Sequence, residues 1–462
     1  MRQQRFVALV LLVASACAST DASAFVGDVR VALKHVDAGK QLSRPELIRR
    51  AMRRSKARAA ALSAARSRGV FRFPPGKSDQ QAPGGTPVRP SGDLEYVVDL
   101  AIGTPPQRIS ALLDTGSDLI WTQCAPCATC LAQPDPLFVP AKSTSYEPMH
   151  CAGPLCSDIA HHGCQRPPDT CTYRYNYGDG TTTMGVYATE RFTFTSSSTS
   201  GDDVLTTVPL GFGCGSVNVG SLNNASGIVG FGRNPLSLVS QLSIRRFSYC
   251  LTPYASGRKS TLLFGSFANT LYGDDDALVQ TTPLLQSPQN PTFYYVHLTG
   301  LTVGTRRLRI PESAFALRQD GTGGVIVDSG TALTLLPGAV LAEVVRVFRT
   351  QLRLPFANGS ADDGVCFVVP TAAWWRRAAG TSSSSSSSQV AVPRMVLHFQ
   401  GGADLDLPRR NYVLDDHRRG RLCLLLADSG DDGSTIGNLV QQDMRVLYDL
   451  EAETLSFAPA QC

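Results

Sequence analysis

Two short segments of the sequence place an aspartate where acid–base chemistry can be done. Each starts with apolar residues typical of a buried strand and continues with Asp, a hydroxyl residue, Gly and another hydroxyl residue. The two copies are Asp114-Thr115-Gly116-Ser117 and Asp328-Ser329-Gly330-Thr331. A carboxylate at the end of a buried strand is costly unless it is hydrogen-bonded, paired or protonated. We therefore expect Asp114 and Asp328 to meet and to share one proton.

Such a pair of carboxyls has a specific chemistry. Two carboxyl groups about 3 Å apart cannot both ionise, so the pair titrates with two separated apparent pKa values. The ionised member can take a proton from a water that attacks a peptide carbonyl, and the protonated member can stabilise the oxyanion. This chemistry predicts hydrolysis without a covalent intermediate, a metal or a cofactor.

The residues around each aspartate suit this role. Glycine allows sharp turns and close backbone approach, and hydroxyl groups can both donate and accept hydrogen bonds. We expect one hydroxyl of each motif to bond across the contact between the two copies and the other to hold its own aspartate. The residues expected to support the pair are Thr115, Gly116, Ser117, Ser329, Gly330 and Thr331.

A second pattern repeats after each motif and indicates an internal duplication. Ile228-Val229-Gly230 follows the first aspartate by 116 residues, and Thr435-Ile436-Gly437 follows the second by 109. Equal order in two halves predicts two related lobes, with a concave site where they meet. Short alternating strands dominate, for example 96–100, 191–195, 294–298 and 395–399, and the best helical stretches are 236–242 and 338–352. The sequence therefore predicts an all-β-dominated, bilobal fold.

The composition divides the chain into four segments. Residues 1–24 carry a basic start, an apolar run too short to span a bilayer and small residues typical of a cleavage site, so they predict a secretory signal peptide. Residues 25–92 form a basic segment, 93–282 the first lobe with a cysteine-rich insertion, and 283–462 the second lobe with a serine run at 382–388. We expect a secreted, extracellular protein.

The basic segment and the lobes carry opposite charge. Residues 25–92 contain 15 basic and 4 acidic residues, whereas 93–462 contain 26 basic and 33 acidic residues. Within the basic segment, 46–68 has the composition of a helix, and a Pro/Gly-rich stretch follows it. We expect a propeptide that lies across the acidic cleft and is released on acidification. A solvated arm, or one that binds nucleic acid or acidic lipid, is the alternative.

Cysteine usage agrees with secretion. One of the 13 cysteines lies in the signal segment, which leaves 12 for six disulfides in an oxidising compartment. The C-x-x-C-x-x-C run could instead ligate zinc or an iron–sulfur cluster, but we expect disulfides and no metal. The disulfide candidates are Cys124, Cys127, Cys130, Cys151, Cys156, Cys164, Cys171, Cys214, Cys250, Cys366, Cys423 and Cys462. Asn224 and Asn358 begin glycosylation acceptor motifs.

The two aspartate motifs, with Trp121 and the segment Tyr177-Gly178-Asp179-Gly180, resemble the pepsin-like aspartic proteases. The cysteine-rich excursion, Phe247-Ser248-Tyr249-Cys250 and the C-terminal cysteine resemble the plant branch of that family, the nepenthesin-type and nucellin-like enzymes. The resemblance implies a pepsin-like fold and a flap that carries Tyr177, Gly178 and Asp179, with Tyr177 bonding toward Trp121. It also implies disulfides Cys250–Cys462 and Cys366–Cys423. Asp179 departs from animal pepsins, and we expect it to bias a substrate subsite.

With a plant protein implied, we expect it in the apoplast or cell wall, with the vacuole as the alternative. These expectations combine into one function. We expect an aspartic endopeptidase, made as a zymogen and active at acid pH, whose partners are polypeptide substrates and its own propeptide as intramolecular inhibitor. We expect a monomer, with neither nucleic acid nor membrane as a partner. A catalytically silent binding or inhibitor protein of the same fold is the alternative; such relatives typically lose a catalytic motif, and both motifs are intact here.

Overall fold

The computed structural model describes residues 30–35, 42–67, 96–197, 203–222, 224–254, 256–272, 278–357, 364–370, 390–430 and 433–462. The predicted signal peptide, the stretch after the basic helix, the serine run and Asn358 lie outside the described residues. Asn224 lies within them and is exposed, with φ at 77°.

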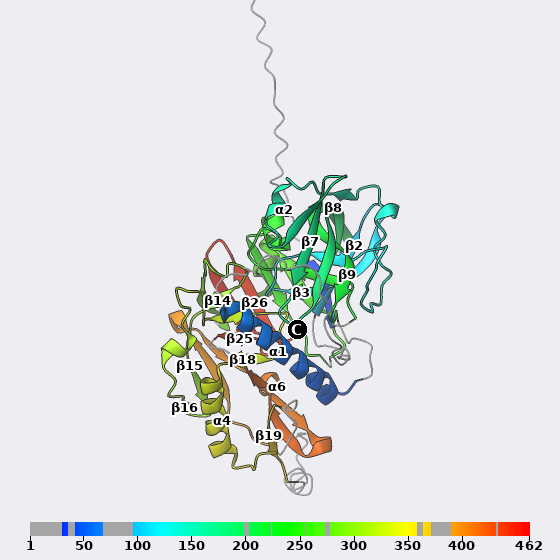
Figure 1. The fold of residues 1–462 in the computed structure, drawn as a ribbon. Helices are drawn as coiled ribbons and strands as arrows, with labels where there is room; N and C mark the ends of the chain where they lie inside the picture. Colours follow the sequence, from blue (N-terminus) through cyan, green and yellow to red (C-terminus); the bar gives the residue numbers. More distant parts are fainter. Residues whose placement is uncertain are drawn as a thin grey trace, which may run out of the picture.

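The first lobe, residues 96–272, is built from strands and, in its described part, two single-turn helices (Figure 1). Its strands are β2 (Tyr96–Ile102), β3 (Gln107–Asp114), β4 (Trp121–Gln123), β5 (Glu147–Pro148), β6 (His162–Gln165), β7 (Thr170–Asn176), β8 (Thr182–Ser197), β9 (Asp203–Val219), β10 (Gly227–Gly230), β11 (Arg246–Cys250) and β12 (Ser260–Phe264). Its helices are α2 (Pro154–Ser157) and α3 (Leu238–Gln241), with 3-10 turns η1 (Pro140–Lys142) and η2 (Gly265–Tyr272).

The second half has the same character and one longer helix, α4 (Gly338–Leu352), at the predicted residues. Its strands are β13 (Gln280–Leu285), β14 (Tyr295–Val296), β15 (Leu298–Val303), β16 (Arg306–Arg307), β17 (Val325–Val327), β18 (Thr334–Leu336), β19 (Val365–Val368), β20 (Met395–Phe399), β21 (Asp404–Asp406), β22 (Val413–Asp416), β23 (Arg421–Leu424), β24 (Leu426–Asp428), β25 (Ser434–Ile436), β26 (Met444–Asp449) and β27 (Thr454–Pro459). Short turns are α6 (Arg409–Tyr412), η4 (Glu312–Phe315), η6 (Gln400–Gly402) and η7 (His417–Arg419).

One predicted strand differs from the structure. The segment 294–298 is interrupted at His297, because β14 pairs with β13 and β17 whereas β15 pairs with β16 and β20. The chain therefore changes sheet within a stretch that sequence alone shows as one continuous alternating run.

The two halves share a central antiparallel sheet. The hydrogen-bonded order is β2, β1, β12, β11, β26, β27 and β13, so β26 from the end of the chain pairs with β11 of the first half. The predicted lobe boundary at 282/283 lies inside β13. This sheet holds the two lobes in a fixed relation.

The basic segment contributes a strand to this sheet. Strand β1 (Arg30–His35) lies between β12 and β2, with Leu33 opposite both Ser260 and Val98. Its buried side chains alternate with exposed ones, as expected for a strand that faces a core on one side. A segment predicted to be removable is thus built into the central sheet.

The basic segment also contains the predicted helix, α1 (Arg44–Ser67). In its first turn the Glu46 carboxylate accepts the backbone N–H of Ser43 at 2.9 Å, which is one half of a capping box, and also the Ser43 hydroxyl at 2.5 Å. Figure 1 shows α1 crossing the region between the lobes, and it packs against β22 and β24. One set of side chains is buried in the main core: Leu47, Ile48, Ala51 and Met52.

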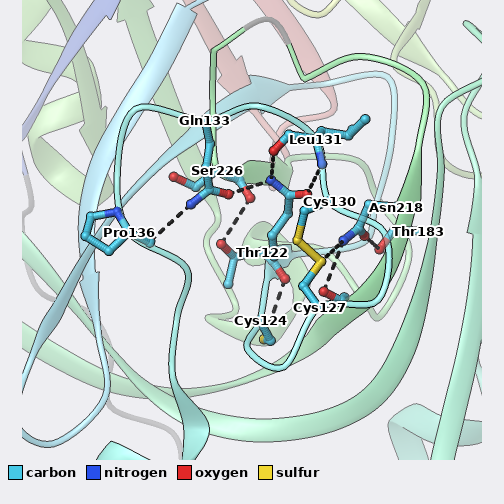
Figure 2. Close-up of a disulfide and its surroundings, with 12 residues drawn as sticks. Thr122, Cys124, Cys127, Cys130, Leu131, Gln133, Pro136, Thr183, Asn218 and Ser226 are labelled. Atoms are coloured by element: carbon cyan, nitrogen blue, oxygen red, sulfur yellow. Dashed lines mark hydrogen bonds between the residues drawn. A yellow bond between two sulfur atoms is a disulfide. The ribbon is translucent and has the colours of Figure 1, made fainter.

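Six disulfides join all twelve cysteines of the described residues. They are Cys124–Cys214, Cys127–Cys130, Cys151–Cys164, Cys156–Cys171, Cys250–Cys462 and Cys366–Cys423, of which the last two are those implied by resemblance. Figure 2 shows Cys127–Cys130, whose loop is held by the Gln123 side chain through bonds to Leu131 and Gln133. The C-x-x-C-x-x-C run is therefore a disulfide-bonded loop.

Among the described residues, no helix combines the length and the apolar character needed to cross a bilayer.

Candidate active site

Each motif aspartate lies at or just after the end of a strand. That strand runs parallel to the strand of the same lobe that carries the repeated apolar-Gly pattern. Strand β3 ends at Asp114, which lies opposite Gly230 of β10, and β17 leads into Asp328 beside β25. A Cβ on Gly230 would overlap the backbone of Asp118, and one on Gly437 would overlap the carbonyl of Leu333. The repeated glycines are therefore required by close backbone approach.

The two motif loops are joined by a symmetric set of hydrogen bonds. The backbone N–H of Thr115 donates to Ser329 Oγ at 3.1 Å, and that of Ser329 donates to Thr115 Oγ1 at 2.9 Å. Each hydroxyl then donates to the opposite strand, Thr115 to the Val327 carbonyl at 3.2 Å and Ser329 to the Leu113 carbonyl at 3.0 Å. These four buried bonds fix the position of one lobe's motif against the other's.

The carboxylates are held in matching ways. The Oδ1 atoms accept the backbone N–H of the following glycine, at 3.0 Å for Gly116 and 2.8 Å for Gly330. The Oδ2 atoms accept hydroxyl groups, Ser117 to Asp114 at 2.6 Å and Thr331 to Asp328 at 2.5 Å. Both predicted roles of the motif hydroxyls are present in the geometry.

The glycines also bring the carboxyl groups together. A Cβ on Gly330 would overlap Oδ1 of Asp114, and one on Gly116 would lie 2.8 Å from Oδ1 of Asp328. Each aspartate therefore lies against the backbone that carries the other. Both are almost fully buried, at 2% and 0% exposure.

A cation from the basic segment occupies the space over this pair. The Nη2 of Arg58, from helix α1, lies 2.8 Å from Oδ1 of Asp114 and 3.1 Å from Oδ2 of Asp328. Its guanidinium lies between the two motif glycines, because a Cβ on Gly116 or on Gly330 would contact it. The Arg58 side chain is only 12% exposed.

The pKa values of the two carboxyls move in opposite directions. For Asp114, burial raises the pKa, but the Arg58 charge and the hydrogen bonds from Ser117, Arg58 and Gly116 outweigh it, so the pKa lies below its usual range. For Asp328, burial is the largest influence, and with the charge of Asp114 it holds the pKa above the usual range despite Arg58. Opposite shifts in a buried carboxyl pair suit division into a base and an acid.

Tyr177 of the predicted flap is near enough to Asp114 for the charge of that carboxylate to affect its pKa. The segment 177–181 connects β7 and β8, and the Trp121 indole N–H donates to the Tyr177 hydroxyl at 2.8 Å. Burial, the neighbouring Tyr175 and the charge of Asp114 raise the Tyr177 pKa well above its ordinary value, so this phenol stays neutral.

The Asp179 side chain stabilises the turn at the tip of the flap. Its two carboxylate oxygens accept the backbone N–H of Thr181 at 2.8 Å and the Thr181 hydroxyl at 3.0 Å. A carboxylate used in this way closes the flap turn. Asp179 therefore shapes the flap, and its expected bias on a substrate subsite stays a prediction.

Sequence reasoning did not single out Arg58 or Asp118. Arg58 was one of many basic residues, although its spacing from Ile48, Ala51 and Ser55 places it near the buried helix face. Asp118 is buried and accepts hydrogen bonds from the Asn234 backbone N–H and from Thr292. It ties the first motif loop to the segment after β10 and to the segment before β14.

The comparisons with known proteins agree with this site. Residues 96–266 match the family described as "Xylanase inhibitor N-terminal" and residues 293–459 the family described as "Xylanase inhibitor C-terminal". The chain is 41% identical to aspartic proteinase nepenthesin-1 of Nepenthes gracilis, over 94% of this chain and 90% of that protein. The chain belongs to the plant pepsin-like aspartic proteases. It is an aspartic-type endopeptidase, and polypeptides are its substrates.

Further relatives of this plant aspartic protease extend the comparison. It is 33% identical to aspartyl protease 37 of Oryza sativa subsp. japonica, over 98% of this chain and 99% of that one. Two solved structures share its fold at 20% identity: that titled "Crystal structure of edgp", with a TM-score of 0.61 over 79% of this chain and 92% of that one, and basic 7S globulin from soybean, with a TM-score of 0.60 over 79% and 93%. The predicted pepsin-like fold is thereby confirmed.

Proposed function

We propose that this protease is made as a secreted zymogen in which residues 25–92 hold the active site closed until the pH falls. The observation that carries the proposal is the contact of Arg58 with both Asp114 and Asp328. A peptide carbonyl must reach the same carboxylates in order to be hydrolysed. Arg58 and a substrate therefore exclude each other.

The rest of the basic segment supports the same reading. Strand β1 pairs on both edges within the central sheet, and helix α1 buries apolar side chains in the main core. Arg58 is therefore held in place by a folded element rather than by charge attraction alone. A solvated basic arm would have neither feature.

Activation by acid follows from the way in which docking of Arg58 is coupled to protonation of the two aspartates. The Arg58 charge lowers the pKa of both carboxyls, so docking of Arg58 favours the ionised dyad. As the pH falls through those pKa values, protonation removes the attraction and the docked state loses stability. Arginine stays charged throughout, so release depends on the aspartates alone.

Removal of Arg58 leaves a dyad ready for hydrolysis. With the cation gone, two close carboxyls hold a single proton between them. The ionised carboxyl takes a proton from the attacking water, the protonated one donates to the carbonyl oxygen, and the tetrahedral intermediate then breaks as the leaving amine is protonated. No covalent enzyme intermediate is needed.

Substitution of Arg58 tests the proposal. We expect the full-length Arg58→Gln protein to cleave a fluorogenic peptide at a pH at which the wild type is latent, with an increase of at least about tenfold because a charge-assisted contact to a buried dyad is lost. Arg58→Lys keeps the charge but loses the planar fork, so its latency should be intermediate. Equal latency of Arg58→Gln and wild type would contradict the proposed role.

Secretion is tested separately. We expect the protein in the medium of expressing plant cells, with an N-terminus after residue 24 before acid treatment and within or after 68–95 afterwards. The exposed Asn224 should carry a glycan, seen as a mass decrease on enzymatic deglycosylation that is absent from Asn224→Gln. Retention in the cytosol with an intact N-terminus would contradict this part of the proposal.

A further inference from the structure

Helix α1 makes a second ion pair with the protease, and this one lies away from the dyad. Nη1 of Arg49 contacts Oδ2 of Asp416, at the end of strand β22, at 2.8 Å. The Asp416 side chain is 6% exposed and that of Arg49 is 22% exposed. The next cation, Nε of Arg419, is 4.0 Å from the same oxygen.

Two other carboxylates have partners within the second lobe, whereas the close partner of Asp416 comes from α1. Asp415 is paired with Arg409, and Asp443 is paired with Arg410, all within the second lobe. These pairs persist when the basic segment leaves. Asp416, in contrast, loses its close partner, and among the described residues Arg419, at 4.0 Å, is the cation that stays near it.

A third polar contact lies between Arg49 and Arg58 along the helix. The Ser55 hydroxyl accepts the backbone N–H of Leu333, a buried residue five positions after Asp328. Departure of α1 frees this N–H for another acceptor, and a peptide carbonyl is the acceptor that a bound substrate supplies. The groups that α1 contacts thus include the dyad, a backbone donor and a carboxylate.

The spacing of these contacts matches an extended peptide. Arg49 precedes Arg58 by nine residues, which is about 13 Å along a helix axis and half a turn around it. Because the two arginines leave the helix on opposite sides, the distance from the dyad to Asp416 is closer to about 18 Å. Four extended residues span about 13 Å, and an arginine side chain covers the remainder.

From these contacts we infer that Asp416 is a specificity-determining residue, uncovered by activation, that binds a basic substrate side chain about three to five residues from the scissile bond. The inference rests on the proposed function, because it takes the basic segment to be removed. The substrate's guanidinium or ammonium group takes the place that Arg49 holds in the zymogen. A carboxylate that is buried and paired in the zymogen thereby regains a cation.

A series of peptides that carry one arginine at successive positions tests the inference. Dodecapeptides with a fixed apolar cleavage sequence carry Arg, Gln or Glu at one position, from five residues before to five after the scissile bond. They are cleaved at low salt by the acid-converted enzyme or, if the chain does not convert itself, by enzyme trimmed with an added protease. At one position three to five residues away, we expect kcat/KM for Arg to exceed that for Gln by about tenfold.

The variants decide whether Asp416 is responsible. In Asp416→Asn the Arg-to-Gln ratio at that position should fall to about one, whereas Asp415→Asn, whose carboxylate is paired with Arg409, should keep it. Added salt should also lower the Arg-to-Gln ratio. Once α1 has left, the ion pair between Asp416 and the substrate arginine is more exposed to solvent than the pair with Arg49, so dissolved ions screen it. A uniform response at all positions, or a preference that survives in Asp416→Asn, would overturn the inference alone. Absence of any cleavage after either treatment would overturn the proposed function with it.

Discussion

The aspartates work through neighbours that are adjacent in sequence. Each motif supplies its own glycine N–H and hydroxyl, and the hydroxyls of Thr115 and Ser329 join the two copies. This part of the site was predictable from sequence, because four consecutive residues determine the local geometry. Arg58 was not, because residue type alone does not tell which of many basic side chains reaches the dyad.

The Tyr177–Trp121 hydrogen bond gives a prediction for a single residue. Tyr177→Phe removes the acceptor of a buried indole N–H, and an unsatisfied buried donor costs about 1–3 kcal/mol. We expect kcat/KM of the converted enzyme to fall by about tenfold or more, because the flap loses the closed position that this bond stabilises. Steady-state kinetics on one peptide measures it.

Tyr175→Phe is the matched control for this change. The Tyr175 hydroxyl is 3.5 Å from the Asp118 N–H, a weak contact, so its loss should cost less. An equal loss in both variants, or none in Tyr177→Phe, would contradict the role given to the Tyr177–Trp121 bond.

Among the elements, strand β1 and helix α1 differ in how far sequence could predict them. Composition predicted α1, since helix propensity is a local property of the sequence. Pairing of 30–35 with β12 and β2 is a contact over long sequence separation, and six alternating residues do not identify their partners. The break at His297 was missed for the same reason, because it depends on which sheets the chain joins.

The insertion of β1 predicts a stability change that depends on processing. Leu33 is fully buried in the core, and truncation of such a side chain typically costs about 2–5 kcal/mol. Leu33→Ala should therefore lower the thermal unfolding midpoint of the full-length zymogen and leave that of the converted enzyme unaltered, because β1 has then departed. Scanning calorimetry before and after conversion measures both.

Ala32→Ser serves as the control, since Ala32 is exposed on the same strand. Should Leu33→Ala lower the midpoint of the converted enzyme by as much as that of the zymogen, β1 would have to remain part of the mature protein.

The whole molecule combines a duplicated protease body with a basic segment whose Arg58 contacts both aspartates of the dyad. The duplication was visible in sequence and predicted the bilobal fold. The charge division was visible too, and it led to the propeptide that we propose closes the active site. The docking path of the segment, from Asp416 past Leu333 to the dyad, required the structure. It links the latency of the zymogen to the specificity proposed for the active enzyme.

The latency of the full-length chain should depend on pH. The contribution of Arg58 to docking is fully present above the ordinary pKa of an aspartate and is lost as the pH falls through the lowered pKa of Asp114. We expect the rate of conversion to rise steeply with acidification below about pH 5. In Arg58→Gln, the dependence of conversion on pH should be weaker.

The most direct measurement is the intact mass of the purified full-length chain during incubation at about pH 4, followed for wild type, Asp114→Asn and Asp328→Asn. Wild type should lose the basic segment and gain activity against a protein substrate, whereas both variants should keep their full mass, because neither retains a dyad that can hold and transfer a proton. Conversion of either variant at the wild-type rate, in the absence of any other protease, would contradict the account.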